Sequence, residues 1–594
     1  MNRSQQGGLG AVELAGLGLL VVVVPVVFDP FGRSGLLAVK VLAASLGVVL
    51  LGASLVRARA VVVPWGRIAA VASASLMVVG VSTLLSPAWE RSLLGAPQRM
   101  SGLLMWLCVA AAFVAGLSLR WRRGESAEAA VMHLSVVAVL AAGLLAMLEV
   151  AGAGGAFAAL EFEGRLRSGL GNPSVLASFV LLVGPLCVAA AALNGRWRWP
   201  AMAACGLGGV MLVGSQSRGA IVAFGVTAAV FAAARSSKPL RYWVIAGTAA
   251  LLAATAAIGR WGELGFGLRG RVAIWEVAFD TIADRPLLGA GPEMFLVEYS
   301  ERVGANTVRE FGRQSVIDRA HGGLLDFAVS SGVVAAVLYF AVLAAVGVLA
   351  VKAMSSSKPA PAALGAGMVA YIVQQQVFFP HPAVDAVFWL FAGIVAAAVG
   401  VRGRPVRSLL VAIAAACVVL GSVANSLSMM RNDHDFERAR TAKTYEAAYR
   451  HLSDAADRRS FDDEPYILMG VLLQTADDSE LIARGEARIR RGESLNPGNE
   501  LVSLALAEVR LQGFRLSDDP VWALRAQAGL DDLIEAQPTN TNAYLKRGVA
   551  WYHLEEFESA EADWQQTAWL SPNDPVPHDN LEVLRQRRAI GGGG

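Results

Sequence analysis

Charged residues are scarce in this chain of 594 residues: Asp, Glu, Lys and Arg make up 17% of it, whereas a soluble protein carries about 25%. Cysteine is scarcer still, and the four residues Cys108, Cys187, Cys205 and Cys417 all lie inside apolar runs. Their spacing fits neither a metal-binding motif nor a disulfide framework, so we interpret them as small packing residues. The low charge excludes an ordinary soluble enzyme.

Apolar residues make up 55% of the chain and gather in long runs. A helix of about 20 residues crosses a hydrocarbon layer of roughly 30 Å, and lipid admits only helices or closed barrels. The sequence therefore predicts an all-α, polytopic transmembrane bundle with spans at 10–28, 35–55, 67–85, 102–119, 131–151, 174–193, 200–214, 219–234, 242–259, 323–351, 361–379, 383–400 and 407–426. We interpret the first run as a span and not as a removed signal peptide, because no cleavage site follows it.

Positive charge alternates between the short connections of these spans. The basic connections hold Arg57/Arg59/Arg67, Arg120/Arg122/Arg123, Arg196/Arg198, Arg235/Lys238/Arg241, Lys352/Lys358 and Arg402/Arg404/Arg407. Because short cytoplasmic loops are rich in Lys and Arg, we place these connections in the cytoplasm. The long loop at 260–322 and the C-terminal tail are then expected on the extracytoplasmic side of a bacterial inner membrane.

The C-terminal part of the chain has a different composition. Residues 431–594 hold 19 Lys/Arg and 29 Asp/Glu, a net charge of −10, whereas the preceding part has a net charge of +13. Pro538 and Pro572 are 34 residues apart, which is the period of the tetratricopeptide repeat. The large and small residues typical of that repeat are Tyr544, Gly548, Trp551, Ala560 and Trp564. We predict a membrane bundle over 1–430 and a tetratricopeptide α-solenoid over 431–590.

The long loop 260–322 carries eight Lys/Arg and nine Asp/Glu, so an anion site here has to be built from individually placed arginines. Residues 271–283 have the periodicity of an amphipathic helix, and Arg285-Pro286 is expected to end it. Arg271 is expected at the start of this helix, where backbone N–H groups also favour an anion. Arginine can grip diphosphate oxygens with a planar, always charged fork, although a single interfacial arginine is often an anchor or an ion-pair partner.

Arg218 and His321 are further candidates on the same side. Arg218 lies between two apolar runs and has no acidic neighbour in sequence, and charge beside hydrocarbon is costly and usually functional. His321 lies at the entry to a span and is a candidate proton acceptor near neutral pH. A histidine at this position is otherwise a structural residue. The alternative proton acceptors are Glu293, Asp318 and Asp326.

Other polar residues near the span ends are weaker candidates. His381, in Phe-Phe-Pro-His-Pro, is interpreted as a loop residue. Gln374–Gln376 lie within a predicted span, and they either bond between helices or line a cavity.

Short motifs follow one another in a fixed order along the chain. They are Arg165-Leu-Arg167 before Gly-Asn-Pro-Ser, Ser217-Arg218-Gly219, Gly270-Arg271-x3-Trp275, Arg285-Pro-x2-Gly-x-Gly291, and Ala320-His321-Gly with Gly332. In their order and spacing they resemble the O-antigen ligase and Wzy-type polymerase superfamily over about residues 90–400.

This resemblance implies a GT-C-like bundle and a metal-independent inverting glycosyltransferase. The implied partners are a polyprenyl (undecaprenyl) diphosphate-linked glycan donor and a glycan or lipid acceptor, with no soluble cofactor. Arg218 and Arg271 are then expected to bind the donor diphosphate, and His321 to position or deprotonate the acceptor hydroxyl. The residues expected to assist substrate binding are Arg165, Arg167, Arg269, Arg285 and Arg319.

Within this class the sequence does not separate a polymerase, a lipid-A-core ligase and a protein O-oligosaccharyltransferase, although we favour a polymerase or an exopolysaccharide ligase. A different class also stays open: a transporter, or a non-catalytic scaffold whose repeats recruit envelope proteins. A transporter predicts broken helices at matching positions of internal repeats, and no such pair is evident. We expect no nucleic-acid partner.

Overall fold

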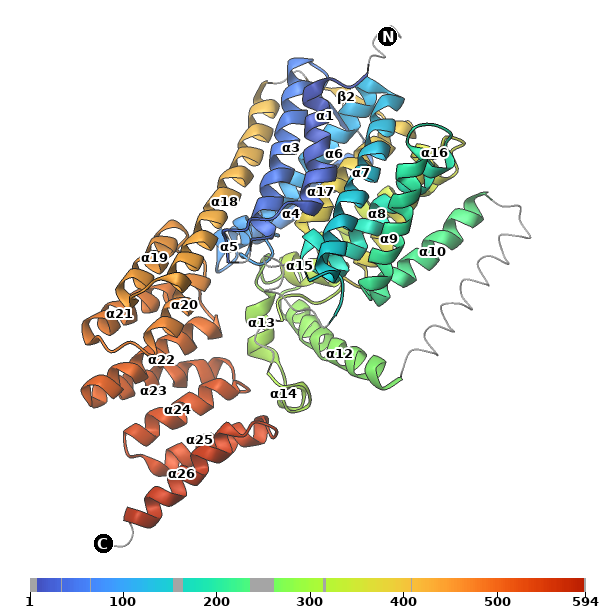
Figure 1. Ribbon diagram of the computed structural model, residues 1–594. Coiled ribbons are helices and arrows are strands. Elements are labelled where there is room, and N and C mark those ends of the chain that lie inside the picture. Colours follow the sequence, from blue (N-terminus) through green and yellow to red (C-terminus); the bar gives the residue numbers. More distant parts are fainter. Residues whose placement is uncertain are drawn as a thin grey trace.

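The computed structural model describes residues 8–33, 35–64, 66–152, 164–235, 261–313, 317–406 and 409–591. Within them the chain is an all-α polytopic membrane protein with a helical bundle, three helices of the long loop at one end of it, and a stack of helices in the tail (Figure 1). In the described residues, eight helices are long and apolar enough to cross a membrane: α3, α4, α6, α7, α8, α10, α15 and α18.

The bundle contains most of the helices before the tail. Its elements are α1 (Ala11–Gly18), the π-helix η1 (Leu19–Val23), α2 (Val24–Val26), α3 (Leu37–Arg57), α4 (Arg67–Leu84), α5 (Trp89–Leu94), α6 (Leu103–Arg123), α7 (Glu125–Val150), the 3-10 helix η2 (Ser168–Leu170), α8 (Pro173–Ala192), α9 (Arg198–Gly214), α10 (Arg218–Arg235), α15 (Gly323–Met354), α16 (Pro359–Gln375), α17 (Pro382–Ala398) and α18 (Leu409–Thr441). The predicted span 242–259 lies outside the described residues. The other predicted spans all lie on helical residues, and the first one falls on α1, η1 and α2 together. The predicted spans 10–28, 200–214, 361–379 and 383–400 lie on helices that are not among the eight named above.

The long loop and the tail supply the other helices of the described residues. In the loop they are α12 (Trp261–Asp284), α13 (Phe295–Arg302) and α14 (Ala305–Phe311). In the tail they are α19 (Tyr445–Arg458), α20 (Glu464–Leu473), α21 (Ser479–Leu495), α22 (Glu500–Ser517), α23 (Pro520–Ala536), α24 (Thr541–His553), α25 (Phe557–Leu570) and α26 (Val576–Gly591).

Helix α17 lies in the core of the bundle, where Leu390 and Ile394 are fully buried. It packs closely against α6 because a glycine stands on each side of the crossing. A Cβ on Gly116 would lie 2.1 Å from the carbonyl oxygen of Leu390, and one on Gly393 would lie 2.1 Å from that of Phe113. Small residues let helix backbones approach in lipid, where burial of apolar surface between helices gives little driving force.

Polar side chains of α16 bond to neighbouring helices. Gln374 Nε2 donates to the carbonyl oxygen of Ser174 in α8 at 3.2 Å. Gln375 Nε2 donates to Asp385 Oδ1 in α17 at 2.9 Å, and Tyr371 OH donates to the same oxygen at 2.8 Å. Of the two roles that the sequence leaves open for Gln374–Gln376, the structure shows bonding between helices for Gln374 and Gln375. Gln376 Nε2 donates instead to the carbonyl oxygen of Ile372 in α16 itself, at 3.0 Å.

The short basic connections meet at one end of the bundle. Between α3 and α4, strand β1 (Val62–Pro64) pairs antiparallel with β2 (Gly403–Pro405), which lies between α17 and α18. Lys358, next to α16, forms an ion pair with Glu125 at the start of α7. Figure 1 shows β2 at the end opposite to α12, α13 and α14. The grouping of the connections agrees with the alternation of charge, and which end faces the cytoplasm stays a prediction.

Helix α15 is broken at Gly332, where φ is +82°. The turn that follows α12 inserts at this break, and the Ala290 N–H donates to the carbonyl oxygen of Val329 at 2.8 Å. A Cβ on Gly332 would lie 2.1 Å from the carbonyl oxygen of Leu287, and one on Gly289 would lie 2.4 Å from that of Val329. Only glycine permits this approach, so the break fastens the long loop to a membrane helix.

The tail continues directly from the bundle. Helix α18 is uninterrupted from the last predicted span to Thr441, so the predicted boundary after residue 430 falls inside a helix. Each helix from α19 to α26 packs against the next one along the chain. At one such contact, the indole of Trp564 in α25 covers Gly548 in α24, and a Cβ there would lie 2.4 Å from Nε1. The assignment of these helix pairs as tetratricopeptide repeats stays a prediction.

Candidate active site in the long loop

His321 lies in the short connection that leads from the long loop into α15, with a positive φ of +53°. The residue before it is held from two sides. The backbone N–H of Ala320 donates to Asp326 Oδ1 in α15 at 2.6 Å, and Trp275 Nε1 in α12 donates to the carbonyl oxygen of Ala320 at 3.0 Å. The position of the imidazole is therefore determined jointly by α12 and α15.

The surroundings of His321 favour the neutral imidazole. Its ring centroid lies 6.0 Å from that of Phe379. Burial lowers the pKa of His321 to about 4, helped by the charges of Arg271, Arg99 and Arg319 and opposed by Asp318. The ring is neutral at pH 7, so it has a lone pair that can accept a proton.

Two arginines beside His321 are engaged by acidic side chains. Arg99 Nε and Nη2 donate to the two carboxylate oxygens of Asp318 at 2.6 and 2.9 Å. Arg319 Nη2 donates to Glu293 Oε1 at 2.5 Å, and both side chains are almost fully buried. Burial alone would raise the pKa of Asp318, but the hydrogen bond and charge of Arg99 outweigh it and lower that pKa. A carboxylate stabilised in this way is a poor proton acceptor.

Arg271 differs from these arginines because it has no acidic partner in the described part of the chain. Within the described residues its half-buried side chain forms neither an ion pair nor a hydrogen bond. Burial lowers the pKa of Arg271, although an arginine stays charged at any physiological pH. A half-buried cation that finds no partner among the described residues, and whose charge reaches a neutral imidazole, favours the binding of an anion.

The expectation that Arg271 begins a helix is wrong. Helix α12 begins at Trp261, so Arg271 lies inside it, away from the free N–H groups of the first turn. The sequence before Arg271 is rich in glycine, including Gly267 and Gly270, and glycine disfavours helix. The helix nevertheless extends through these residues, so Arg271 acts through its side chain and not together with a helix terminus.

Arg165 and Arg218 form a second group at the turn between α9 and α10. Arg165 Nε donates to the carbonyl oxygen of Ser215 at 3.0 Å, and Arg218 is the exposed first residue of α10. This turn packs against the one that follows α16, because a Cβ on Gly219 would lie 2.7 Å from Val377 Cγ2. The turn after α16 also contains Phe379, which packs on His321. The arginines near His321 and the pair Arg165 and Arg218 therefore lie on two sides of the connection that follows α16.

The remaining predicted residues are engaged elsewhere. Arg167 pairs with Glu149 at 3.0 Å, the exposed Arg269 with Glu310 at 3.4 Å, and Arg285 with Glu298 at 2.9 Å. His381 caps α17, where its Nδ1 accepts from the N–H of Ala383 at 3.3 Å.

Sequence reasoning did not single out Arg99 and Phe379. Arg99 pairs with a residue 219 positions away, and its guanidinium lies 4.6 Å from the centroid of the Phe379 ring. Both residues occupy short connections whose local sequence is unremarkable in composition. Nothing in a single chain marks two connections that meet only in the folded protein.

Within the described residues, no three His, Cys, Asp or Glu side chains gather as metal ligands do. A comparison with curated proteins found no match for the chain. Residues 203–340 match the model of a family described as O-antigen ligase. This segment contains Arg218, Arg271 and His321, and the match supports a relationship to the O-antigen ligase superfamily, with a general role in glycan ligation or polymerisation.

Proposed function

We propose that this protein transfers a glycan from a polyprenyl diphosphate-linked donor to a hydroxyl group of a glycan or lipid acceptor, at the outer face of the bacterial inner membrane. The observation that carries the proposal is that Arg271, which has no partner within the described residues, lies near enough to His321 for its charge to help keep the imidazole neutral. Both residues lie in the segment that matches the O-antigen ligase family.

The proposed reaction is a single inverting displacement. The acceptor oxygen attacks C1 of the donor sugar, the bond between C1 and the phosphate oxygen breaks on the opposite face, and polyprenyl diphosphate leaves with the electron pair. His321 takes the proton of the acceptor hydroxyl as the new C–O bond forms. Arg271 stabilises the negative charge that develops on the leaving diphosphate. The donor brings its own leaving group, so the reaction needs no soluble cofactor.

Donor binding also prepares the proton acceptor. In the free protein, the positive charge of Arg271 helps to lower the pKa of His321. A diphosphate beside Arg271 offsets that charge, and this raises the pKa of the imidazole and makes it a stronger base. The base is then strongest when the donor is in place, which limits proton transfer in an empty site.

The other arginines are given supporting roles in this proposal. Arg218 is the second diphosphate ligand, since it stands exposed at the N-terminus of α10, where the helix dipole also favours an anion. Arg165 assists from the same turn through its bond to Ser215. Arg319 positions the connection at His321 through Glu293. Arg269 and Arg285 are exposed and paired with acids, and in this proposal they do not contact the donor.

The members of this class of enzyme differ in the acceptor that they use. We favour a polymerase or an exopolysaccharide ligase, with the tail as an extracytoplasmic tetratricopeptide domain. A lipid-A-core ligase and a protein O-oligosaccharyltransferase share the donor chemistry and differ in the molecule that receives the glycan. The identity of the glycosylated product therefore decides between them.

A deletion strain tests the proposed function. Loss of the protein is expected to cause accumulation of the lipid diphosphate-linked glycan and loss of the mature polymer. A plasmid copy with Arg269→Ala restores the polymer, because Arg269 is 75% exposed and only loosely paired. A copy with Arg271→Ala does not restore it, although the protein accumulates in the membrane. A deletion strain with normal polymer and no accumulated donor contradicts the proposal.

A further inference from the structure

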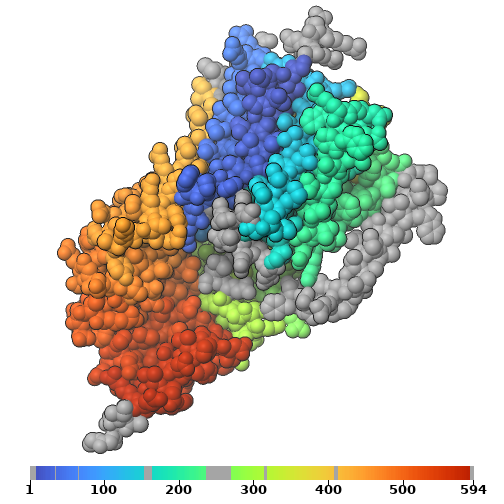
Figure 2. All heavy atoms as spheres, in the orientation of Figure 1, coloured from blue at the N-terminus to red at the C-terminus, as the bar shows by residue number. Residues whose placement is uncertain are grey.

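The turns that precede α20, α22 and α24 lie along one side of the tail, and we call residues 462–464, 498–500 and 537–541 the turn edge. In Figure 2, the orange and red atoms of the tail and the yellow-green atoms of the long loop form a continuous surface on the face shown. The approach is close, since a Cβ on Gly498 would lie 2.6 Å from Val297 Cγ1 in α13. The tail is therefore seated on the loop that carries the candidate site.

An arrangement of charges repeats along the turn edge. Arg91 of α5 pairs with Asp463 at 3.2 Å, and Asn499 of the next turn donates to the same carboxylate oxygen at 2.5 Å. One turn further on, Arg313 of the long loop pairs with Glu500, and Asn540 donates to the same carboxylate oxygen at 2.7 Å. In each case an arginine from outside the tail meets an acid that also holds two consecutive turns of the tail together.

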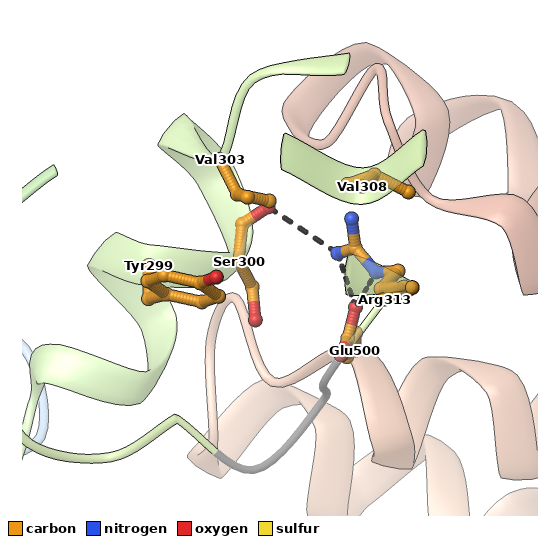
Figure 3. Close-up of a pocket in the computed structure, with 7 residues that line it drawn as sticks. Tyr299, Ser300, Val303, Val308, Arg313 and Glu500 are labelled. Carbon is orange, nitrogen blue, oxygen red and sulfur yellow. Dashed lines mark hydrogen bonds and ion pairs between the residues drawn. The ribbon is translucent and has the colours of Figure 1, made fainter. Parts of the chain in front are cut away.

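Both ion pairs are buried. All four side chains are less than a tenth exposed, so each charge depends on its partner. Figure 3 shows the Arg313–Glu500 pair in a pocket between loop and tail, beside Tyr299 and Ser300. The pocket has no room for a water molecule, and Arg313 also donates to the carbonyl oxygen of Ser300 at 3.3 Å. This pocket is thus a packed contact and not a substrate site.

Apolar contacts join the same surfaces. Leu570, at the end of α25, is fully buried in one cluster with Val308 of α14 and Tyr299 of α13. Arg309 lies over the ring of Trp569 at 4.8 Å from its centroid. Loop and tail therefore share a hydrophobic core as well as the buried ion pair.

This shared core reaches the candidate site. It contains Ile274, three residues after Arg271 in α12, and Ala320, the residue before His321. Ala320 is itself bonded to Trp275 of α12 at 3.0 Å. A movement of α13 and α14 away from the tail would loosen the packing that holds α12, with Arg271, beside the connection that carries His321.

We propose that the tail is a positioning element of the active site, and that Glu500, through Arg313, holds the long loop in the geometry that pairs Arg271 with His321. This inference rests on the proposed function for its consequence in catalysis, but the docking itself is independent of the reaction. Glu500 touches no reacting atom and acts only through the loop.

The test compares Glu500→Gln with Glu508→Gln in the full-length protein, reconstituted in liposomes with an undecaprenyl diphosphate-linked oligosaccharide. Glu508 pairs with Lys546 inside the tail and serves as the matched control. Glu500→Gln removes the charge and leaves Arg313 buried without an ionised partner. We expect turnover to fall at least tenfold, hydrogen exchange in 295–313 and 317–322 to increase, and the acidic limb of the pH profile of kcat/KM to move upward. The control is expected to match the wild type in all three measurements.

Thr539→Val is a milder second variant, should Glu500→Gln fail to accumulate. It removes the bond from Thr539 Oγ1 to the carbonyl oxygen of Val303, which is 3.0 Å long, and the bond accepted from Arg313 at 3.1 Å. The same three changes are expected with smaller size.

Unchanged hydrogen exchange in the loop overturns the docking of the tail on the long loop. Increased hydrogen exchange together with full turnover and an unchanged pH profile overturns the positioning role of the tail. A wild-type protein without transfer activity contradicts the proposed function, and in that case the exchange measurement alone decides on the docking.

Discussion

Replacing Arg271 by Gln removes a half-buried cation that, within the described part of the chain, has no ion pair or hydrogen bond to lose. The substitution leaves no acid uncompensated there, so we expect the variant to fold and to accumulate as the wild type does. Its effect should fall on the reaction. In this respect Arg271 differs from Arg319, whose removal strands the buried carboxylate of Glu293.

The size of the loss follows from the electrostatics of the site. Two unit charges about 4 Å apart interact by about 4 kcal/mol when the effective dielectric constant is about 20, a value suited to a half-buried pair. Part of this attraction already stabilises the bound donor. If about 3 kcal/mol acts on the transition state, the rate falls roughly a hundredfold. Arg271→Lys recovers only part of it, because a single ammonium group does not reproduce the fork of a guanidinium.

The same substitution should shift the pH dependence in a defined direction. The charge of Arg271 disfavours the imidazolium, and it is the largest cause of the low pKa of His321 after burial. Its removal raises that pKa from about 4 toward the ordinary value of 6.5. Because the neutral ring is the active form, the acidic limb of kcat/KM moves to higher pH, while the hundredfold loss persists above pH 7.

The assay measures kcat/KM between pH 4 and pH 8 for the purified wild type, Arg271→Gln and Arg269→Gln in liposomes that contain an undecaprenyl diphosphate-linked oligosaccharide. Arg269 lies two residues away in α12 and is 75% exposed, so its substitution is the control for a change of charge on the same helix. Wild-type activity in Arg271→Gln, or equal losses in both variants, refutes the reasoning about the site.

Three further predictions concern the base, the fold and the topology. His321→Ala lowers turnover by roughly 10²–10⁴ with little change in donor affinity, because the proton acceptor serves the chemical step, and unchanged turnover in the purified variant contradicts this. Gly332→Ala places a Cβ 2.1 Å from a backbone oxygen at a φ of +82°, so we expect it to lower the melting temperature in detergent by several degrees. Gly206→Ala is the control, because a Cβ there meets no atom within 4 Å and should leave the melting temperature unchanged. Equal melting temperatures of the two variants count against the packed break in α15. Reporter fusions are active outside the cytoplasm after residue 440 and inside it at Arg120–Arg123, and the reverse pattern overturns the assigned topology.

The membrane helices could be predicted because their signal is local. Long apolar runs and the charge of short connections are readable in any window of the sequence, and each predicted span in the described part of the chain lies on helical residues. The bounds of α12 were less predictable. Arg285-Pro286 correctly indicated its end, which lies at Asp284, but the periodicity of residues 271–283 placed its start too late, because the helix extends back to Trp261 through residues rich in glycine.

Contacts between distant segments were not predictable from one chain. Asp318 and Glu293 read as exposed acids and possible bases, yet each pairs with an arginine, and Arg99 comes from a connection 219 residues away. Glu500 and Arg313 likewise look like ordinary surface charges until the tail folds onto the loop. The sequence of a segment indicates which of its faces is polar. It does not indicate which polar face of a distant segment packs against it.

Stoichiometric release of the lipid carrier is the most direct measure of the central claim, that His321 and Arg271 catalyse glycan transfer from a polyprenyl diphosphate donor. Purified protein in liposomes is incubated with the labelled donor and an acceptor glycan, and the released lipid and the elongated acceptor are quantified together. We predict one polyprenyl diphosphate released for each glycan transferred, with both products reduced in parallel by His321→Ala and Arg271→Gln. An intact donor after prolonged incubation with folded, donor-binding protein, or transfer that is unaffected by both substitutions, contradicts the claim.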